Sequence, residues 1–491
     1  MSTDNDSLDQ RRLGSTLTNP LIEAAHQFPG KVALITEQES LTYTQLLNRA
    51  WAVRSRLAAQ GLRAGDIVVL DDIRPEAMIM LLWACSLGNL VAFPLNTRFP
   101  ETTLSTILMN IKPALVISER LLVPELSITY HELLSPTSDL ASLESAKFDL
   151  SAAATLLMTS GSTGSAKIVQ HSHLNHLSSA LGSNQNIFLK PDHRWLLTLP
   201  LYHVGGISIL YRGALSGAAV VLPTSTESIL TNIFSKQITH ISLVAAQLRR
   251  MLQEADVKKM LGCLQAILLG GSAIPKALIQ KGLNQNLPLH VSYGSTEMAS
   301  QITTTSSRDR ATALVNSGML LEGRDLIISH LGEILVKGDT LAMGYIEASQ
   351  LLNLRDLKGW FHTGDVGYLD VQGALTVTGR IDNQFISGGE NIQPEHIERS
   401  LCNLSGIAQA IVLPLSDQEY GFRPAAYLQI DSVGIDLDQI ISELKRSLPG
   451  YMIPVAFYQL PPELMGAEVK ISRQDLSKYI LDGNKPLHPL T

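Results

Sequence analysis

The sequence predicts an α/β protein: a large N-terminal domain of parallel-type sheets with packed helices, and a small, mobile α+β C-terminal domain. Short apolar runs alternate with helical patterns through most of the chain, which is typical of parallel sheets covered by helices. The 491 residues exceed the roughly 250–300 residues at which a single hydrophobic core stops growing. The composition, 45% hydrophobic and 17% charged, is that of a folded globular chain.

The first clear helix is expected just after residue 42. Four apolar residues recur there at helical spacing, namely Leu46, Ala50, Val53 and Leu57. Thr42 and Gln45 can form a capping box, because each side chain can accept a hydrogen bond from the other's backbone N–H. Residues 66–72, "DIVVLDD", then predict a short buried strand.

Residues 77–95, "AMIMLLWACSLGNLVAFPL", are nearly long and apolar enough to span a bilayer. Gly88 and Asn89 interrupt the run with a turn signal, and Pro94 follows close behind. A buried helix followed by a buried strand is therefore favoured over a membrane span.

Four further apolar runs predict strands, at residues 114–119, 238–244, 264–271 and 289–295. The last two run into glycine and serine, as Gly270-Gly271-Ser272 and Gly294-Ser295-Thr296. Ligands of parallel α/β folds bind beyond the carboxyl ends of the strands, so these two segments are expected to line a site.

From about Gly332 the pattern of alternating strands and helices gives way to short apolar runs separated by glycines. Short strands joined by glycine turns are expected there. These strands lie at residues 332–338 and 373–382. A smaller unit follows, with a capped helix within 391–404, strands at 408–415 and 424–430, and a helix at 436–448. We expect the boundary at Arg380–Asp382, which gives an N-terminal domain of residues 1–380 and a C-terminal domain of residues 381–491.

The charge and cysteine patterns exclude several kinds of partner. Thirty-eight basic and 45 acidic side chains give a formal net charge of −7, which argues against nucleic acid. Cys85, Cys263 and Cys402 have no metal-binding spacing and fit a reducing compartment. Residues 1–12 are polar and lack a signal peptide's apolar core, so a cytoplasmic location is expected. The oligomeric state, a homo-oligomer included, stays open.

Residues 159–167, "TSGSTGSAK", could bind an anion or serve as a linker. The stretch fails the phosphate-loop pattern of nucleotide triphosphatases, because Ala166 stands where Gly is required and Ile168 where a Mg²⁺-binding hydroxyl is required. It nevertheless lies between two apolar runs, and its glycines, hydroxyls and Lys167 suit an anion held in a strand–loop–strand unit. Since serine- and glycine-rich runs are often flexible linkers, the residues alone leave both interpretations open.

Two stretches could bind a nucleotide. Residues 293–297, "YGSTE", combine an aromatic ring, a close backbone approach, a hydroxyl and a carboxylate, which suits a Mg²⁺-nucleotide. Residues 360–365, "WFHTGD", predict a turn whose Asp365 could accept both hydroxyls of a ribose. Taken alone, each stretch is also readily explained as an ordinary turn.

Two further stretches lie at or beyond the expected boundary. Residues 379–398, "GRIDNQFISGGENIQPEHIE", place Arg380 and Asp382 at the boundary itself. Residues 469–473, "VKISR", place Lys470 in a C-terminal loop. Alone, the first is explained equally well as a linker and the second as one exposed lysine among many.

Together, and in this order, the five stretches resemble the adenylate-forming superfamily of acyl- and aryl-CoA synthetases, luciferases and peptide-synthetase adenylation domains. The resemblance covers the chain from Thr42 to Arg473. Several stretches are more specifically similar to the 2-succinylbenzoate–CoA ligase branch, which serves menaquinone and phylloquinone biosynthesis. They are "LPLYHVGGISIL", "SLVAAQLRRML", "LLGGSAIP", "GRIDNQFISGGENIQPEHIE", "DQEYGFRPAA" and "VKISRQDL".

The resemblance implies two half-reactions with 2-succinylbenzoate, ATP, Mg²⁺ and CoA: formation of an acyl-adenylate, then its attack by the CoA thiol. It implies a catalytic role for Lys470, His203, Thr296 and Glu297, with Glu297 also as the Mg²⁺ ligand. It implies nucleotide binding by Thr159, Ser160, Gly161, Ser162, Thr163, Gly164, Lys167, Gly271, Ser272, Tyr293, Gly294, Asp365 and Arg380. Asp382 matches the hinge about which the C-terminal domain rotates between the half-reactions, removing Lys470 from the site.

The chain departs from the superfamily pattern at two positions. Ala166 replaces the usual Pro before the loop lysine, and Val469 replaces the common Gly before Lys470. Neither change removes a functional group, and the consequence of Ala166 is left open. Another aryl- or acyl-CoA ligase, and a nucleotide-binding protein without catalysis, stay as alternatives.

Several other polar residues have a structural explanation. Apart from the resemblance, His203 is best explained as a buried histidine whose ring nitrogens have hydrogen-bond partners. The three histidines near the loop, His171, His173 and His176, lack a metal-binding spacing and are interpreted as structural. The second carboxylate of 2-succinylbenzoate needs a partner, and the sequence does not choose among Ser208, Arg212 and Gln247.

Overall fold

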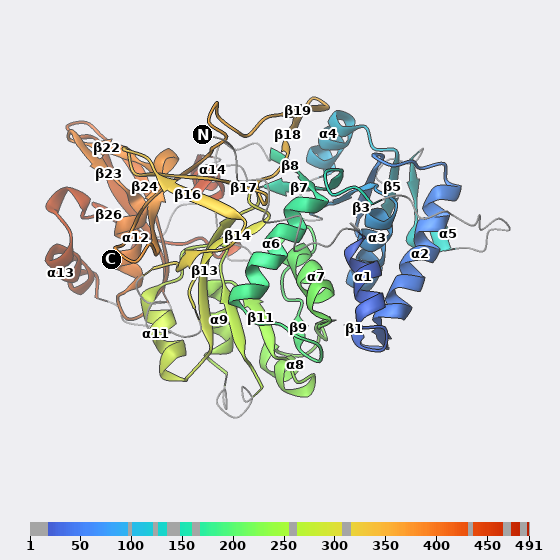
Figure 1. The fold of residues 1–491 in the computed structure, drawn as a ribbon. Coiled ribbons are helices and arrows are strands. Elements are labelled where there is room, and N and C mark those ends of the chain that lie inside the picture. The colour runs from blue at the N-terminus through green and yellow to red at the C-terminus, as the bar shows by residue number, and fades with distance from the viewer. Residues whose placement is uncertain are drawn as a thin grey trace, which may run out of the picture.

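The computed structural model describes residues 18–96, 101–120, 126–134, 148–159, 167–254, 263–306, 316–430, 436–464, 473–481 and 489–490. Their helices and strands form two large mixed sheets with helices packed between and around them, a four-stranded antiparallel sheet, and a small C-terminal α+β unit (Figure 1). The predicted α/β class with a large N-terminal part and a small C-terminal part is confirmed. The boundary between residues 380 and 381 remains a prediction.

The first large sheet has eight strands. In spatial order they are β19 (Gln350–Leu352), β18 (Gly344–Glu347), β8 (Lys167–Ser172), β7 (Ala153–Thr159), β4 (Val91–Pro94), β3 (Ile67–Asp71), β5 (Leu115–Ser118) and β6 (Ser127–Ile128). The strands from β7 to β6 run parallel. The three pairs at the other end, β7–β8, β8–β18 and β18–β19, are antiparallel.

The second large sheet has nine strands. In order they are β15 (Met319–Leu320), β14 (Ser300–Thr304), β13 (Leu289–Ser295), β12 (Ala266–Leu269), β11 (His240–Leu243), β9 (Arg194–Leu196), β10 (Ala219–Val221), β1 (Val32–Ile35) and β2 (Ser40–Thr42). The pairs from β13 to β1 are parallel, and the outer pairs are antiparallel.

Helices pack against both sheets and bury their apolar faces there. They are α1 (Pro20–Gln27), α2 (Tyr43–Ala59), α3 (Pro75–Leu87), α4 (Glu101–Ile111), α5 (Tyr130–Leu134), α6 (His173–Asn186), α7 (Val204–Ser216), α8 (Ile229–Ser235), α9 (Ala245–Met251) and α11 (Lys276–Asn284). The largest hydrophobic cluster draws on α2, α3, α6 and α7 and on strands of both large sheets. Burying this shared core stabilises the two sheets as one body.

The chain then forms smaller sheets. β16 (Arg324–Ile328), β17 (Glu333–Gly338), β20 (Phe361–Leu369) and β21 (Leu375–Arg380) make the four-stranded sheet, and a 3₁₀ turn (Ile381–Asn383) follows. The C-terminal unit contains β22 (Phe385–Ser387), β23 (Glu390–Ile392), α12 (Pro394–Cys402), β24 (Ile407–Asp417), β25 (Gly421–Ile430), α13 (Leu437–Ser447), β26 (Ala456–Gln459), α14 (Arg473–Leu481) and 3₁₀ turns at Gly450–Met452 and Pro462–Leu464.

The local predictions for residues 42–95 are confirmed. Thr42 caps α2 with the expected reciprocal bonds to Gln45. The apolar run 77–95 forms the buried helix α3 and strand β4, separated by Gly88 and Asn89, whose φ is 50°. Among the described helices, none combines the length and the apolar character needed to cross a membrane.

Two local predictions are wrong. Helix α12 has no side-chain cap, because the amide of its N-cap residue Gln393 instead donates to the backbone oxygen of Arg380 at 2.8 Å. Asp365 lies inside strand β20 rather than in a turn. The neighbouring Gly364 has φ 69°, and a β-carbon there would lie 2.9 Å from Nη2 of Arg380, so the glycine accommodates a close side chain.

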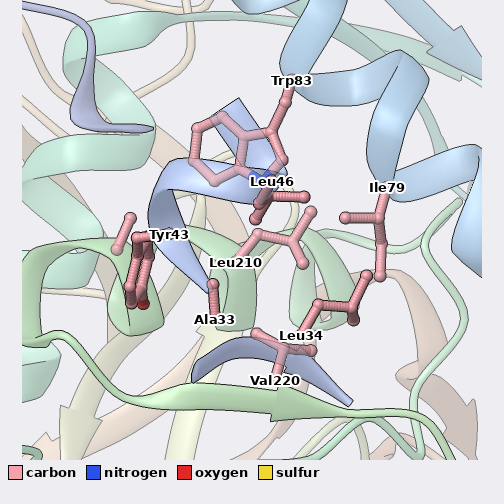
Figure 2. A pocket seen from close by; sticks show the side chains of 9 residues that line it. Ala33, Leu34, Tyr43, Leu46, Ile79, Trp83, Leu210 and Val220 are labelled. Carbon is pink, nitrogen blue, oxygen red and sulfur yellow. The ribbon is translucent and has the colours of Figure 1, made fainter. Parts of the chain in front are cut away.

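A small pocket lies in the main core, between α2, α3, α7 and strands β1 and β10 (Figure 2). It is lined by Ala33, Leu34, Tyr43, Leu46, Ile79, Trp83, Leu210, Ala214 and Val220. The lining offers no charged group, and the only hydroxyl, that of Tyr43, bonds to backbone oxygens of α7 and the turn after it. The pocket is therefore a packing void and not a nucleotide site.

Candidate active site

A cluster of tyrosine, aspartate and arginine forms where the nine-stranded sheet meets the four-stranded sheet. Asp365 and Arg380 are direct partners in the β20–β21 ladder, and Nη1 of Arg380 bonds to Oδ1 of Asp365 at 2.8 Å. Tyr293, from β13, donates its hydroxyl to Oδ2 of Asp365 at 2.6 Å. The structure thus brings together three of the predicted nucleotide-binding residues.

This cluster holds a largely buried carboxylate in a fixed orientation. Burial raises the pKa of Asp365, while the hydrogen bond from Tyr293 and the charge of Arg380 act in the opposite direction. Burial beside this carboxylate also raises the pKa of the Tyr293 hydroxyl well above its usual value, so the tyrosine is a donor at neutral pH. Each carboxylate oxygen retains a lone pair that can accept a hydroxyl of a ribose.

The turn after β13 carries Thr296 and Glu297 and is fixed at three points. The ring nitrogen Nε2 of His171 bonds to the backbone oxygen of Thr296 at 2.7 Å. The backbone N–H of Ala342 donates to the backbone oxygen of Glu297 at 2.8 Å, and the hydroxyl of Tyr345 donates to Oε1 of Glu297 at 2.8 Å. These contacts orient the carboxylate of Glu297.

Of the two side chains that hold this turn, the sequence patterns marked His171 only as structural and gave no sign of Tyr345. His171 is fully buried, which lowers its pKa to about 4, so it is neutral at physiological pH. Because a carbonyl only accepts, Nε2 must carry the ring proton. Tyr345 comes from β18, next to β8 in the sheet, and only that pairing reveals its position.

The predicted phosphate loop connects β7 and β8, which form an antiparallel pair. Thr159 and Lys167, at its two ends, are direct partners in the ladder, so the predicted strand–loop–strand unit is confirmed. Lys167 is exposed, and its ammonium nitrogen lies 4.8 Å from the ring centroid of Tyr345. The other predicted loop residues lie outside the described part of the chain: Ser160, Gly161, Ser162, Thr163, Gly164 and the variant position Ala166.

Gly271 and Ser272 follow β12 at the carboxyl edge of the nine-stranded sheet. Because β12 and β13 pair in parallel, this segment lies beside the start of the 293–297 stretch. Gly271 has φ 79°, a conformation that favours glycine. A β-carbon at Gly294 would lie 2.0 Å from the backbone oxygen of Ser300, so this position admits only glycine.

His203 is the N-cap of α7 and is exposed. The interpretation as a buried, satisfied histidine is therefore wrong. Its ring packs edge-on against that of Tyr202, with the centroids 4.7 Å apart. An exposed imidazole at the start of this helix can reach a bound molecule.

The donor set around Glu297 fits Mg²⁺ better than a metal held only by protein. No group of three potential metal-ligating side chains occurs within the described residues, the three histidines near the loop included. Mg²⁺ is commonly held by one or two carboxylates together with water and substrate phosphates. Glu297 offers a single carboxylate, and Tyr345 contacts both this carboxylate and Lys167 at the end of the predicted phosphate loop. This arrangement matches that pattern.

The predicted hinge lies in a 3₁₀ turn directly after β21. Nη2 of Arg380 bonds to the exposed carboxylate of Asp382 at 3.0 Å. Arg399, from α12, donates to the backbone oxygens of Val377 and Thr378 at 3.1 and 2.8 Å. A few polar contacts therefore hold the C-terminal unit against β21 next to the turn.

We expect Asp382→Pro to block one half-reaction, because proline fixes φ at the residue that would absorb the rotation. Asp382→Ala removes the same carboxylate but leaves the backbone free, and an exposed ion pair contributes only about 0–1 kcal/mol. Single-turnover rates of adenylation and thioester formation would be compared in both variants. Wild-type rates for both steps in the proline variant would move the hinge elsewhere.

Lys470 lies outside the described residues, but the end of its motif is visible. Arg473 begins α14, and its Nη2 bonds to both carboxylate oxygens of Glu398 at 2.6 Å. Nη1 of Arg473 lies 3.1 Å from Glu395. Burial raises the pKa of Glu398 to about 7 despite the nearby arginine. This cluster anchors the residue that ends the motif.

Burial and hydrogen-bond partners distinguish the three residues considered as partners of a second substrate carboxylate. Ser208 donates to the backbone oxygen of Gly205 at 2.9 Å, and Gln247 accepts from the N–H of Val244 at 3.1 Å. Arg212 is buried, and none of the described acidic side chains pairs with it. Burial and the charge of Arg324 lower the pKa of Arg212 to about 9.

Arg212 lies next to the stretch that contains Glu297. Its Nη2 donates to Oε1 of Gln301 at 2.9 Å and to Ser300 at 3.3 Å, and β14 pairs Ser300 with Ser295. Its Nε has no partner within the described residues. A buried guanidinium without a carboxylate is costly, so this position favours an anionic ligand.

Comparisons with known proteins agree with this geometry. The model of the AMP-binding enzyme family matches residues 21–346. The 2-succinylbenzoate–CoA ligase of Oceanobacillus iheyensis is 31% identical over 482 residues, covering 95% of this chain and 100% of that protein. The Escherichia coli ligase of the same name is 33% identical over 453 residues, covering 91% and 95%.

Solved structures give the same result. The o-succinylbenzoate CoA synthetase of Bacillus subtilis in complex with its acyl-adenylate intermediate matches with a TM-score of 0.83 and 31% identity, over 90% of this chain and 94% of that one. The same enzyme in complex with ATP and a magnesium ion matches with a TM-score of 0.82 and 31% identity, over 90% and 95%. This chain belongs to the AMP-binding enzyme family.

Proposed function

We propose that the chain ligates 2-succinylbenzoate to CoA through an acyl-adenylate, consuming ATP and releasing AMP and pyrophosphate, in menaquinone biosynthesis. Relatives named for this reaction match nearly the whole chain at about one third identity. A solved relative was captured with the acyl-adenylate of the same acid. The enzyme is thus an AMP-forming acid–thiol ligase.

The main obstacle to the first half-reaction is charge, because a carboxylate must attack a polyanion. The predicted loop and Lys167 would hold the β- and γ-phosphates, and Thr296 would contact the α-phosphate. Glu297 would hold Mg²⁺, which neutralises part of the phosphate charge when bound. Lys470 would contact the substrate carboxylate and the α-phosphate oxygens.

The remaining predicted residues would position the nucleoside and the acid. Gly271 and Ser272 would border the adenine with Tyr293, and the paired Asp365 and Arg380 would bind the ribose. The fixed Tyr293–Asp365–Arg380 cluster supports this role, since its carboxylate is already oriented before a nucleotide binds. The exposed His203 would lie near the reacting carboxylate.

One observation carries the choice of acid: the buried Arg212, which lacks a carboxylate partner among the described residues. 2-Succinylbenzoate has two carboxylates, of which only the aliphatic one is activated. The other would pair with the guanidinium of Arg212 and relieve its uncompensated charge. A fatty acid or simple benzoate would leave that charge unpaired, so the position favours a diacid.

A panel of carboxylic acids tests this assignment. The purified chain would be incubated with ATP, Mg²⁺ and CoA and with 2-succinylbenzoate, benzoate, anthranilate or a fatty acid in turn. We expect 2-succinylbenzoate to give a kcat/KM for thioester formation at least roughly a hundredfold above the monoacids, the scale of leaving a buried charge unpaired. Preference for a monoacid would replace the proposal with another acyl- or aryl-CoA ligase.

A further inference from the structure

Tyr345 lies between two groups of opposite charge. Its hydroxyl donates a hydrogen bond to Oε1 of Glu297 at 2.8 Å. On its ring face, the ammonium nitrogen of Lys167 lies 4.8 Å from the ring centroid. The ion pairs found among the described residues do not include one between Lys167 and Glu297. The tyrosine therefore contacts both charges while they remain unpaired with each other.

The fold fixes Tyr345 in this place through both large sheets. β18 pairs antiparallel with β8, so that Tyr345 lies opposite Val169, close to the strand's start at Lys167. The preceding segment reaches across to the other sheet, where the N–H of Ala342 bonds to the backbone oxygen of Glu297 at 2.8 Å. The backbone of Tyr345 is thus held by strand pairing, independently of the two charged side chains.

The two contacts of Tyr345 differ in kind from an ion pair. A lysine and a glutamate that lie this near to a common neighbour can attract each other directly, and the attraction strengthens away from bulk water. Such a pair would occupy the cation needed for phosphate and the carboxylate needed for Mg²⁺. A neutral hydroxyl and a ring face hold both groups without neutralising either charge.

We propose that Tyr345 is a positioning residue that keeps Lys167 and Glu297 apart, so that the lysine stays available for the phosphates and the carboxylate for Mg²⁺. This inference rests on the proposed function, from which it takes the nucleotide roles of Lys167 and Glu297. It adds a residue that contributes before the nucleotide arrives, by preserving two charges in usable form.

Two variants separate the two contacts. Tyr345→Phe removes the hydroxyl and keeps the ring, whereas Tyr345→Leu removes both. Binding of α,β-methylene-ATP would be measured by titration calorimetry at limiting and at saturating Mg²⁺. We expect the Phe variant to need about fivefold more Mg²⁺ for half-maximal binding, the scale of one typical net hydrogen bond. At saturating Mg²⁺ its affinity for the analogue stays within about twofold of wild type.

The Leu variant also removes the contact between the ring face and Lys167. With the ring gone, Lys167 is free to pair with Glu297, so affinity for the analogue falls roughly a further threefold even at saturating Mg²⁺. Tyr368→Phe, which alters an exposed tyrosine of β20, serves as the matched control and should bind like wild type. Thermal melting checks that each variant is folded, and the Phe variant alone decides the hydrogen bond if the Leu variant does not fold.

Different results would overturn the proposed function and the role of Tyr345. A wild-type chain that does not bind the analogue in a Mg²⁺-dependent way overturns the proposed function, and this inference with it. A wild-type chain that binds it, together with a Phe variant of unchanged Mg²⁺ requirement, overturns the role of Tyr345 alone. A raised Mg²⁺ requirement in the Phe variant, combined with weakened nucleotide binding in the Leu variant, supports it.

Discussion

Replacing Lys470 with Ala is expected to slow adenylation by roughly 10²–10³-fold, the scale of losing one preorganised charge contact in a transition state. The reason is that negative charge moves onto the α-phosphate oxygens as the substrate carboxylate attacks, and the lysine would stabilise it there. Thioester formation from a supplied acyl-adenylate should proceed at nearly the wild-type rate, because the small domain would have carried the lysine away. The two half-reactions would be followed separately in single-turnover experiments.

The control for this prediction is another lysine of the same C-terminal region. Lys478 is an exposed residue of α14, and Lys478→Ala should leave both half-reactions within about twofold of wild type. Equal loss of both half-reactions in the Lys470 variant would contradict a role confined to adenylation. It would point instead to a lysine needed for folding or for a shared binding step.

Replacing Arg212 with Met is expected to lower kcat/KM for 2-succinylbenzoate by roughly 10²–10³-fold, because one carboxylate of the acid would be buried without its partner. The guanidinium is buried over the ring of Trp195, its Nε has no partner among the described residues, and no described carboxylate balances its charge. The test compares 2-succinylbenzoate with 4-oxo-4-phenylbutanoate, which lacks the ring carboxylate. Wild type should strongly prefer the diacid, and the variant should treat the two acids alike within a few fold.

The comparison of two acids separates recognition from damage to the fold. A structural defect would lower activity with both acids and leave the preference intact, whereas loss of the carboxylate partner removes the preference itself. Ser208→Ala is the matched control on the same helix, since its hydroxyl is already bonded within α7, and it should keep the wild-type preference. An unchanged preference in the Arg212 variant would assign the second carboxylate to another residue.

The parts of the fold that depend on local patterns could be predicted from the sequence. The capping box of α2 and the break between α3 and β4 each involve residues within a few positions of one another. The strands at 264–271 and 289–295 were likewise marked by apolar runs ending in small residues. Patterns of this length report the local backbone directly.

Two short polar stretches were less reliable. Residues 360–365 predicted a turn, but Gly364 within them leaves room for the guanidinium of Arg380, which comes from the neighbouring strand. Gln393 precedes α12 without capping it, because its amide bonds to the backbone of Arg380 instead. In both cases a tertiary contact took precedence over the local preference, and a sequence pattern does not contain that contact.

In the candidate site too, some residues could be identified from local motifs and others only from the tertiary structure. The motifs identified Tyr293, Asp365 and Arg380, and the structure brings these three together. Tyr345 escaped notice, and His171 was interpreted as structural without its partner, because their contacts with the 296–297 turn depend on sheet pairing between distant segments. Arg212 was one of three equal candidates until burial and partners could be compared.

The proposed function requires that this chain activates a carboxylic acid as its adenylate. The most direct measurement is isotope exchange between pyrophosphate and ATP in the absence of CoA, with and without 2-succinylbenzoate. We expect rapid exchange that requires both Mg²⁺ and the acid, because only the reversible formation of an acyl-adenylate returns pyrophosphate to ATP. Binding of ATP without any acid-dependent exchange would contradict it, and would identify the chain as a nucleotide-binding protein without catalysis.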